Sequence, residues 1–501
     1  RYYISLRTDN NVEKAYDVVI IGSGIIGTTI ARQLSKYRLK ILLLEKGIDV
    51  AMGATKANSA IVHGGYAEPH TTLKGQLCYR GRQAYAQLDR ELNFGFRQTG
   101  SLVVTTMDDP APLEQLLEQG RANGLDDLRL VDQEELRQLE PKLNPDLKWG
   151  LLCEGAGVCS PYEMAIAMAE NAITNGAELR LESEVTGISG NKGNFTVQTP
   201  EESFRTRYVI NAAGVYSDQV SQMVGVDDFT ILPRSGQYLL FARGSGKAVN
   251  HVIFGLPTAK GKGILLASTI YDNLLIGPDA SEEEDREDTS TDLERLAKIY
   301  DACKQLYGDL DPKQFLRSFT GVRARSSSDD FIIEESKVPG FIQVAGIQSP
   351  GLTAAPAIAE LVEDILQRAD LELEPDPNFN PHRKPIIQYR ELRPLREIKP
   401  LLDIPSSPEK VICRCEQVTE GEIIDACQRR IPVKTIDGIK RRTRASMGWC
   451  QGTFCRPRII EVMKQLNEQP FDGRFDIEHS GVSRVEKSEL LDFLTAREGE
   501  A

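Results

Sequence analysis

The chain has 501 residues, of which 41% are hydrophobic and 27% are charged, and its formal net charge is −13. A chain of this length exceeds one ordinary hydrophobic core, so we expect two or three domains. The acidic balance argues against sequence-independent binding of nucleic acid, and no apolar run reaches the roughly 18 residues that a membrane-spanning helix needs. Nine clustered cysteines, and a first segment without the apolar core of a secretory signal, favour a reducing cytoplasm.

A strand, a glycine-rich turn and a helix open the folded part of the chain. Residues 18–21 form a short apolar run that is typical of a buried parallel strand, and a helical pattern extends from Ile25 to about Tyr37. A second apolar strand is predicted at residues 41–44 and ends at an acidic residue. This order predicts a Rossmann-like unit that binds a dinucleotide.

The turn between the first strand and the helix reads GSGIIG. Gly22 would allow the tight turn, Gly24 would let the backbone approach a pyrophosphate, and Gly27 would let the helix pack on the strand. The positive end of the helix dipole would face the phosphates. Glu45 lies where an acid can bind ribose hydroxyls, and its neighbour Lys46 joins it as a cofactor-binding candidate. These residues alone leave NAD and FAD as alternatives.

Four later segments resemble those that contact the flavin in the D-amino-acid-oxidase-like FAD oxidoreductases. In chain order they are GATKANSAIVHGG, LESEVTGIS, YVINAAGVYSD and FIQVAGIQSPGLTAAPAIAELV. With the first segment, the resemblance covers roughly residues 16–366 and implies FAD. The residues implied to hold it are Thr55, Asn58, Ser59, Val185, Gly214, Asp218, Gly346, Gly351, Leu352 and Thr353. In the last segment a strand at 341–345 enters a glycine-rich turn, and the following helix would turn its amides toward the flavin edge.

The same resemblance implies a sheet-rich substrate domain, inserted at about residues 77–140 and 226–319. Short strands are predicted at GQYLLF, GILLAS and NLLIGPDA. Two branches of the superfamily are similar. The L-2-hydroxyglutarate oxidases are similar in two stretches, NSAIVHGGYAEPHTTLKGQLCYRG and TGVRARSSSDDFIIE. The cysteine-rich C-terminal part resembles instead the anaerobic FAD-dependent glycerol-3-phosphate dehydrogenases.

Both branches oxidise a small anionic secondary alcohol, so the site needs a cation for the acid group and a base for the hydroxyl proton. Arg323 matches the arginine that meets the substrate anion in the superfamily, although Ala324 follows it where many glycerol-phosphate enzymes have proline. The further cation candidates are Lys56 and Arg325. The candidate bases are His63, in the flavin segment, and His251. The sequence contains no nucleophile–histidine–acid arrangement and no Walker loop, which excludes hydrolase and kinase readings.

A stretch rich in proline and charge, residues 367–410, predicts a linker, and a cysteine-rich module follows at 411–466. The pattern Thr419-x-x-Glu422 predicts a capped helix with Cys427 on its buried face. The remaining cysteines of the module are spaced as C-x-C and C-x4-C, at Cys413, Cys415, Cys450 and Cys455. The module resembles the bacterioferritin-associated-ferredoxin-like domain, which implies a [2Fe–2S] cluster on these four thiolates. Zinc and a module without metal stay as alternatives.

A basic run, QRRIPVKTIDGIKRRTRASM, separates the two cysteine pairs. It would stabilise an anionic cluster, present a solvated face, or dock an acidic electron-transfer partner. Aromatic residues that would stack on bases are missing from it. The tail at 467–501 ends in an acidic stretch that predicts a short amphipathic helix.

The sequence as a whole predicts an α/β (α+β) protein. It would have a Rossmann-like FAD-binding domain with an inserted sheet-rich substrate domain, and a small helical domain for the cysteine cluster. The expected activity is an FAD-dependent dehydrogenase that passes electrons through the cluster to a partner protein or subunit. Glycerol 3-phosphate is the first expected substrate, L-2-hydroxyglutarate the second, and an amine or imino acid the third. A scaffold subunit of a larger redox complex is the non-enzymatic alternative. Oligomerisation and membrane association through a partner stay open.

Overall fold

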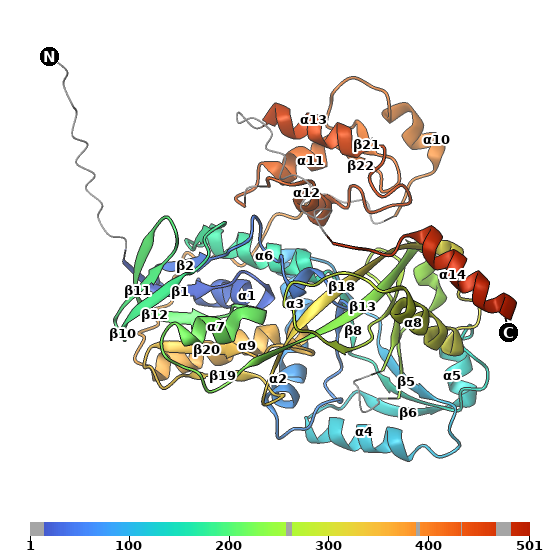
Figure 1. Cartoon of the computed structure of the whole chain (residues 1–501), viewed down its shortest axis with the longest axis horizontal. Coiled ribbons are helices and arrows are strands. Elements are labelled where there is room, and N and C mark those ends of the chain that lie inside the picture. Colours follow the sequence, from blue (N-terminus) through green and yellow to red (C-terminus); the bar gives the residue numbers. More distant parts are fainter. Residues whose placement is uncertain (1–14, 257–262, 387–390, 432, 467–481, 501) are drawn as a thin grey trace.

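The computed structural model describes residues 15–256, 263–386, 391–431, 433–466 and 482–500. Two large sheets form the body, and a small helical domain from the C-terminal part of the chain lies against it (Figure 1). This arrangement confirms the predicted α/β fold with a small C-terminal helical domain. The first segment, 1–14, and the beginning of the predicted tail, 467–481, lie outside the described residues.

The nucleotide-binding sheet has the strand order β10-β11-β12-β1-β2-β9, and β20 joins it beside β12 with β19 at its edge. β1 pairs in parallel with both β2 and β12 because its apolar residues are buried on both faces. Helix α1 packs against both α6 and α9 beside this sheet (Figure 1). The bounds are β1 Ala15–Ile21, β2 Ile41–Leu44, β9 Glu178–Arg180, β10 Gly187–Asn191, β11 Asn194–Gln198, β12 Ser203–Asn211, β19 Ile332–Glu335, β20 Phe341–Ala345, α1 Ile25–Leu34, α6 Pro161–Thr174, α7 Ser217–Gln222 and α9 Gly351–Arg368.

The second sheet has the order β17-β13-β16-β15-β14-β5-β7-β6, with β18 beside β13. β13 and β18 are long antiparallel strands that pair along most of their length. Helix α8 packs on β13 and β16. The bounds are β5 Ser101–Thr105, β6 Leu128–Asp132, β7 Trp149–Cys153, β13 Ile231–Arg243, β14 Val252–Gly255, β15 Leu265–Ser268, β16 Asn273–Gly277, β17 Ser281–Glu282, β18 Phe315–Ser326, α4 Ala111–Ala122, α5 Gln133–Leu139 and α8 Leu293–Leu306.

The two insertions differ in extent from the predicted ranges 77–140 and 226–319. Helices α2 (Leu73–Arg82) and α3 (Tyr85–Leu92) pack on α9 and α6 of the nucleotide-binding part. Gly81 explains the first contact, because a Cβ there would lie 2.2 Å from the backbone oxygen of Thr353. The second sheet also includes β7 and the end of β18, which lie beyond the predicted ranges. A third, small sheet pairs β8 (Gly157–Cys159) with β3 (Ile61–Val62) and β4 (Phe96–Gln98).

The C-terminal domain has its own hydrophobic core, which includes Ile423, Ile439 and Met463. Helix α11 begins with the predicted capping box of Thr419 and Glu422, and half-buried Cys427 packs against the core. The bounds are α10 Leu395–Ile398, β21 Val411–Cys413, β22 Val418–Thr419, α11 Glu420–Cys427, α12 Ile436–Thr443, α13 Arg456–Leu466 and α14 Lys487–Glu500. The chain then returns to the body, where α14 forms the predicted helix and packs on α8 (Figure 1). Within the described residues, no helix combines the length and the apolar character that crossing a membrane requires.

Candidate active site and cluster site

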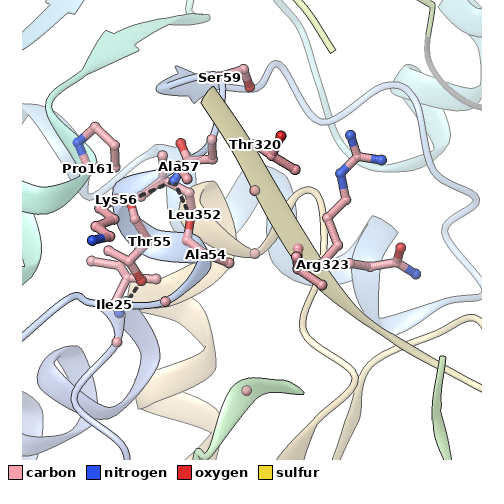
Figure 2. A pocket seen from close by; sticks show the side chains of 18 of the residues that line it. Ile25, Ala54, Thr55, Lys56, Ala57, Ser59, Pro161, Thr320, Arg323 and Leu352 are labelled. Atoms are coloured by element: carbon pink, nitrogen blue, oxygen red, sulfur yellow. Dashed lines mark hydrogen bonds between the residues drawn. The ribbon is translucent and has the colours of Figure 1, made fainter. Parts of the chain in front are cut away.

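A cavity of about 1590 Å³, which we call the cofactor cavity, lies at the junction of the two sheets and the C-terminal domain. Its wall includes the β1–α1 turn, the 3₁₀ turn Ala54–Lys56, strand β18 and the start of α9 (Figure 2). Helix α12 of the C-terminal domain contributes Asp437, Lys440 and Arg441. The volume is large enough for a dinucleotide and a small substrate together.

The glycine turn leaves its backbone accessible to a phosphate. Gly22 has φ +101°, and a Cβ there would lie 2.5 Å from the backbone oxygen of Ala212. A Cβ on Gly27 would lie 1.9 Å from the oxygen of Gly22, so only glycine lets α1 pack this closely. The Thr55 hydroxyl accepts a hydrogen bond of 2.9 Å from the amide of Ile25 and lines the cavity (Figure 2). These features fit the pyrophosphate of FAD.

Glu45 and Lys46 line the next part of the cavity. The Glu45 carboxylate accepts hydrogen bonds from the amide and hydroxyl of Ser23, at 2.9 and 2.7 Å, and from the amide of Gly47. A carboxylate has about four lone-pair sites, so one stays for a ribose hydroxyl. Lys46 lies over the ring of Tyr216 and pairs with Glu287 at 2.9 Å.

Of the other residues predicted to contact the flavin, one group lines the cavity and a second group does not. The first group includes Ser59, Val185, Gly214, Gly351 and Leu352. Asn58 lines it too, but its side-chain amide is occupied within its own turn, where it bonds to the backbone of Ala54, Thr55 and Ala60.

Asp218, Gly346 and Thr353 are not part of the cavity wall, and their contact with the flavin stays a prediction. Asp218 is buried and bonds to the Arg286 guanidinium, at 2.6 and 2.9 Å, and to the amide of Ile231. Because of these partners the pKa of Asp218 is lowered, although burial alone would raise it. Each of the three adjoins a residue that does line the cavity, namely Gln219, Ile347 and Leu352.

Thr353 shows how such a residue supports the wall. Its hydroxyl accepts a hydrogen bond of 2.9 Å from the amide of His63 and donates to the backbone oxygen of Ile61. It therefore ties the first turn of α9 to the flavin segment.

Arg323 extends from β18 into the cavity (Figure 2). Its guanidinium donates a hydrogen bond of 3.0 Å to the backbone oxygen of Asp279. It also lies beside the phenol of Tyr238, and burial raises the pKa of that phenol. Among the residues that the structure describes, no carboxylate forms an ion pair with Arg323. Its neighbour Arg325, by contrast, pairs with Asp329 at 2.8 Å and lies outside the cavity wall.

The two candidate bases lie in different places. His63 lines the cavity, its ring is stacked on Phe254, and its Nε2 is 3.4 Å from the hydroxyl of Ser349. His251 lies outside the cavity wall, where its Nδ1 is 2.8 Å from the Glu140 carboxylate. This contact and the hydrogen bond from the His251 amide to the same carboxylate orient the start of β14, and the catalytic role of His251 stays a prediction that its position outside the wall does not support.

Sequence reasoning missed the part that the C-terminal domain plays in this cavity. Lys56, predicted as a substrate cation, lies 3.7 Å from Asp437 of α12. Arg444 and Met447, from the segment after α12, are part of the wall. The basic run is the signal in the sequence that points to an interaction of this domain. The spacing of its residues does not show which surface the run covers.

The four predicted cluster cysteines come together in two close pairs. The sulfurs of Cys415 and Cys450 are 3.6 Å apart. Two thiolates on one tetrahedral metal with bonds of about 2.3 Å would be separated by roughly 3.7 Å. The Cys413 thiol donates a hydrogen bond to the sulfur of Cys455, which lowers the pKa of Cys455 to about 6 and raises that of Cys413.

No group of three or more ligand-type side chains converges on a single point among the described residues. Two separate pairs instead fit a centre with two metal ions, each held by two thiolates. The donor set of four sulfurs suits iron–sulfur chemistry.

Comparison with known proteins is consistent with both sites. Residues 17–365 match the family of FAD dependent oxidoreductases, and residues 411–465 match the BFD-like [2Fe-2S] binding domain. The chain is 42% identical to a glycerol 3-phosphate dehydrogenase from Caloramator mitchellensis, over 89% of this chain and 94% of that one. It is 27% identical to the mitochondrial L-2-hydroxyglutarate dehydrogenase of Homo sapiens, over 71% of this chain and 89% of that one.

A solved structure is also similar: the FAD-bound L-alpha-glycerophosphate oxidase of Mycoplasma pneumoniae, with a TM-score of 0.70 and 30% identity over 74% of this chain and 98% of that one. The predicted cofactors, FAD and a [2Fe–2S] cluster, are confirmed by these matches. The chain belongs to the FAD-dependent oxidoreductases and carries a BFD-like [2Fe–2S] domain at its C-terminal end.

Proposed function

We propose that the enzyme oxidises glycerol 3-phosphate to dihydroxyacetone phosphate. When bound, FAD supplies the acceptor for a hydride, and the [2Fe–2S] cluster supplies a carrier for single electrons. The observation that carries the proposal is Arg323, a cation in the cofactor cavity whose described partners are uncharged. The similarity to a glycerol 3-phosphate dehydrogenase supports the choice of substrate, because it extends over both domains.

Two side chains of the cavity, Arg323 and His63, would bind the substrate and accept its proton. The Arg323 guanidinium binds the phosphate, and the backbone oxygen of Asp279 together with Tyr238 holds it in place. His63 accepts the proton of the secondary hydroxyl while the hydride leaves the same carbon, so the carbon loses two electrons and becomes a ketone. Phe254 and Ser349 hold the imidazole from two sides.

The electrons leave to an acidic one-electron carrier protein, which we place at the surface around the cluster. Trp449 and Phe454 are among the few large apolar side chains that are exposed, at 58% and 75%, and each directly precedes a cluster cysteine. The first cluster loop and the start of α13 also carry Arg414, Arg456 and Arg458, and the acidic residue beside Cys415, Glu416, is buried, in a chain of net charge −13. This charge pattern suits an acidic partner. We place the enzyme in the cytoplasm.

L-2-hydroxyglutarate is the second candidate, since it offers the same anionic secondary alcohol and several relatives carry that name. The test is an anaerobic titration of the FAD-loaded protein with each compound. Bleaching of the flavin absorption by glycerol 3-phosphate at lower concentration supports the proposal. Bleaching by L-2-hydroxyglutarate alone would replace it, and no bleaching by either would leave the scaffold alternative.

The partner surface is tested separately. Trp449→Ser with Phe454→Ser should slow reduction of an acidic carrier such as a flavodoxin, and leave reduction of a small dye unchanged. Equal effects on the carrier and on the dye would show that the aromatic pair is not a docking surface.

A further inference from the structure

Helix α12 is a buried part of the contact between the two domains and not a solvated face. Arg441 and Arg442 have exposed fractions of 3% and 0%, and both bond to the carboxylate of Asp49 in the nucleotide-binding part. Arg442 binds both oxygens of Asp49, at 2.7 and 2.9 Å, while Arg441 binds one at 2.7 Å and also the backbone oxygen of Val50. We call this contact the Asp49 lock.

A second contact lies on the side of the other sheet. Glu416, next to the cluster cysteine Cys415, accepts hydrogen bonds from Arg243 of β13 at 3.1 Å and from Arg444 at 3.0 Å. Arg444 also lies over the ring of Tyr271, 3.9 Å from its centroid. The C-terminal domain is therefore held against both sheets by buried charges.

A short segment, residues 444–450, connects the wall of the cofactor cavity to the cluster ligands. Met447 lines the cavity, and its sulfur is 3.9 Å from the hydroxyl of Tyr162, which lines it too. On the other side of the segment, a Cβ on Gly448 would lie 2.3 Å from the Cβ of Cys415, and the Ser446 hydroxyl is 3.5 Å from the sulfur of Cys455. Ser446 thus contacts the sulfur of Cys455, and Gly448 packs closely against Cys415, so the residues on either side of Met447 adjoin two of the four cluster ligands.

We propose that residues 444–450 form the route by which electrons pass from the flavin to the cluster within one chain, and that the Asp49 lock fixes its length. The inference rests on the proposed function, which supplies the electrons. Each passage moves one electron, so reduced FAD, which holds two, empties in two passages. The one-electron carrier reoxidises the cluster between them, and the protons leave to solvent.

The experiment measures flavin and cluster separately in the loaded protein. In anaerobic stopped-flow with glycerol 3-phosphate, the loss of the flavin absorption band measures oxidation of the substrate. The change of the broader iron–sulfur band measures reduction of the cluster. The paramagnetic signal of samples frozen at the same times checks the second measurement. The wild-type cluster should be reduced at a rate that does not depend on protein concentration. Reduction proportional to concentration would mean transfer between molecules and would overturn the proposal.

The variant that tests the lock is Asp49→Asn, which removes the Asp49 carboxylate from both buried guanidinium groups, while Arg441 keeps its second partner, Asp437, at 3.1 Å. We expect cluster reduction to slow by about tenfold or more, with flavin bleaching unchanged. Arg243→Gln, on the opposite side of the interface, should act in the same direction. Asp370→Asn is the matched control, because its partner Lys192 forms an exposed pair at 2.9 Å on the same domain.

A second readout does not depend on catalysis. Hydrogen exchange of the amides in residues 436–450 should rise in Asp49→Asn and stay at the wild-type level in Asp370→Asn. Wild-type rates of cluster reduction in both interface variants would contradict the route. If glycerol 3-phosphate fails to bleach the flavin, the proposed function fails, and reduction of the flavin by light then tests the route alone.

Discussion

Replacement of Arg323 by methionine tests the substrate site most directly. A guanidinium has five N–H donors, and the described partners of Arg323 are the backbone oxygen of Asp279 and the phenol of Tyr238. Three donors then remain, and two of them can bind one phosphate as a bidentate pair. Hydrogen bonds to a charged group contribute about 1.5–3 kcal/mol each, so the variant should lose about 3–6 kcal/mol of binding in the transition state.

This loss corresponds to a decrease in kcat/KM for glycerol 3-phosphate of roughly 10²–10⁴-fold. The assay is anaerobic turnover with a small dye as acceptor, together with measurement of the FAD content. Arg325→Met is the matched control, because Arg325 is two residues away on the same strand, does not itself line the cavity and pairs with Asp329. A kcat/KM of Arg323→Met within threefold of the control would refute the assignment of Arg323 to the phosphate.

Three further predictions concern the two cofactors and the stability of the C-terminal domain. Thr55→Val removes the acceptor for the amide of Ile25, and titration of the apoprotein should show FAD binding weakened by about tenfold; unchanged affinity would contradict the role of Thr55. Cys415→Ser should abolish the iron–sulfur absorption and leave the FAD content intact, whereas retention of both would exclude Cys415 as a ligand. Burial raises the pKa of Glu422 to about 7, so the stability that its protonated form contributes is complete below its ordinary pKa of 4.5 and is lost as the pH rises toward 7. Glu422→Gln should flatten the dependence of the melting temperature on pH in this window, and an unchanged slope would point to another group.

The parts of the fold that the sequence predicts well are those in which local pattern and packing agree. The apolar strands β2 and β20 have the predicted bounds, because short buried runs next to glycine turns admit few alternatives. Helix α1 ends at Leu34 and not near Tyr37, since Tyr37 bridges to Pro375, far away in the sequence. The spacing of apolar residues along the helix does not reveal such a long-range partner, so it could not predict where α1 ends.

The candidate site shows the same limit at the level of single residues. His63 precedes two glycines and His251 precedes an apolar strand, and only the structure shows that one faces the cavity and the other an acid. The basic run was equally ambiguous. Its charges suited a solvated face, a cluster or an external partner, and the buried carboxylate of Asp49, almost four hundred positions away, decides where Arg442 lies.

The chemistry of this interface indicates what it was selected to do. A buried ion pair often contributes little net stability compared with apolar residues of the same size, because both charges lose their hydration. Removal of one partner is nevertheless costly, and the pair accepts only a narrow range of geometries. An apolar contact could stabilise the association of the C-terminal domain equally well, but it is not directional and would allow a wider range of domain positions. Arg442 on Asp49 and Arg243 on Glu416 instead fix its position on two sides of the cavity. A fixed position matters little for a tethered scaffold, whereas transfer of electrons depends steeply on distance. The buried charges of the interface therefore favour an electron-transfer role for the C-terminal domain over a scaffolding role.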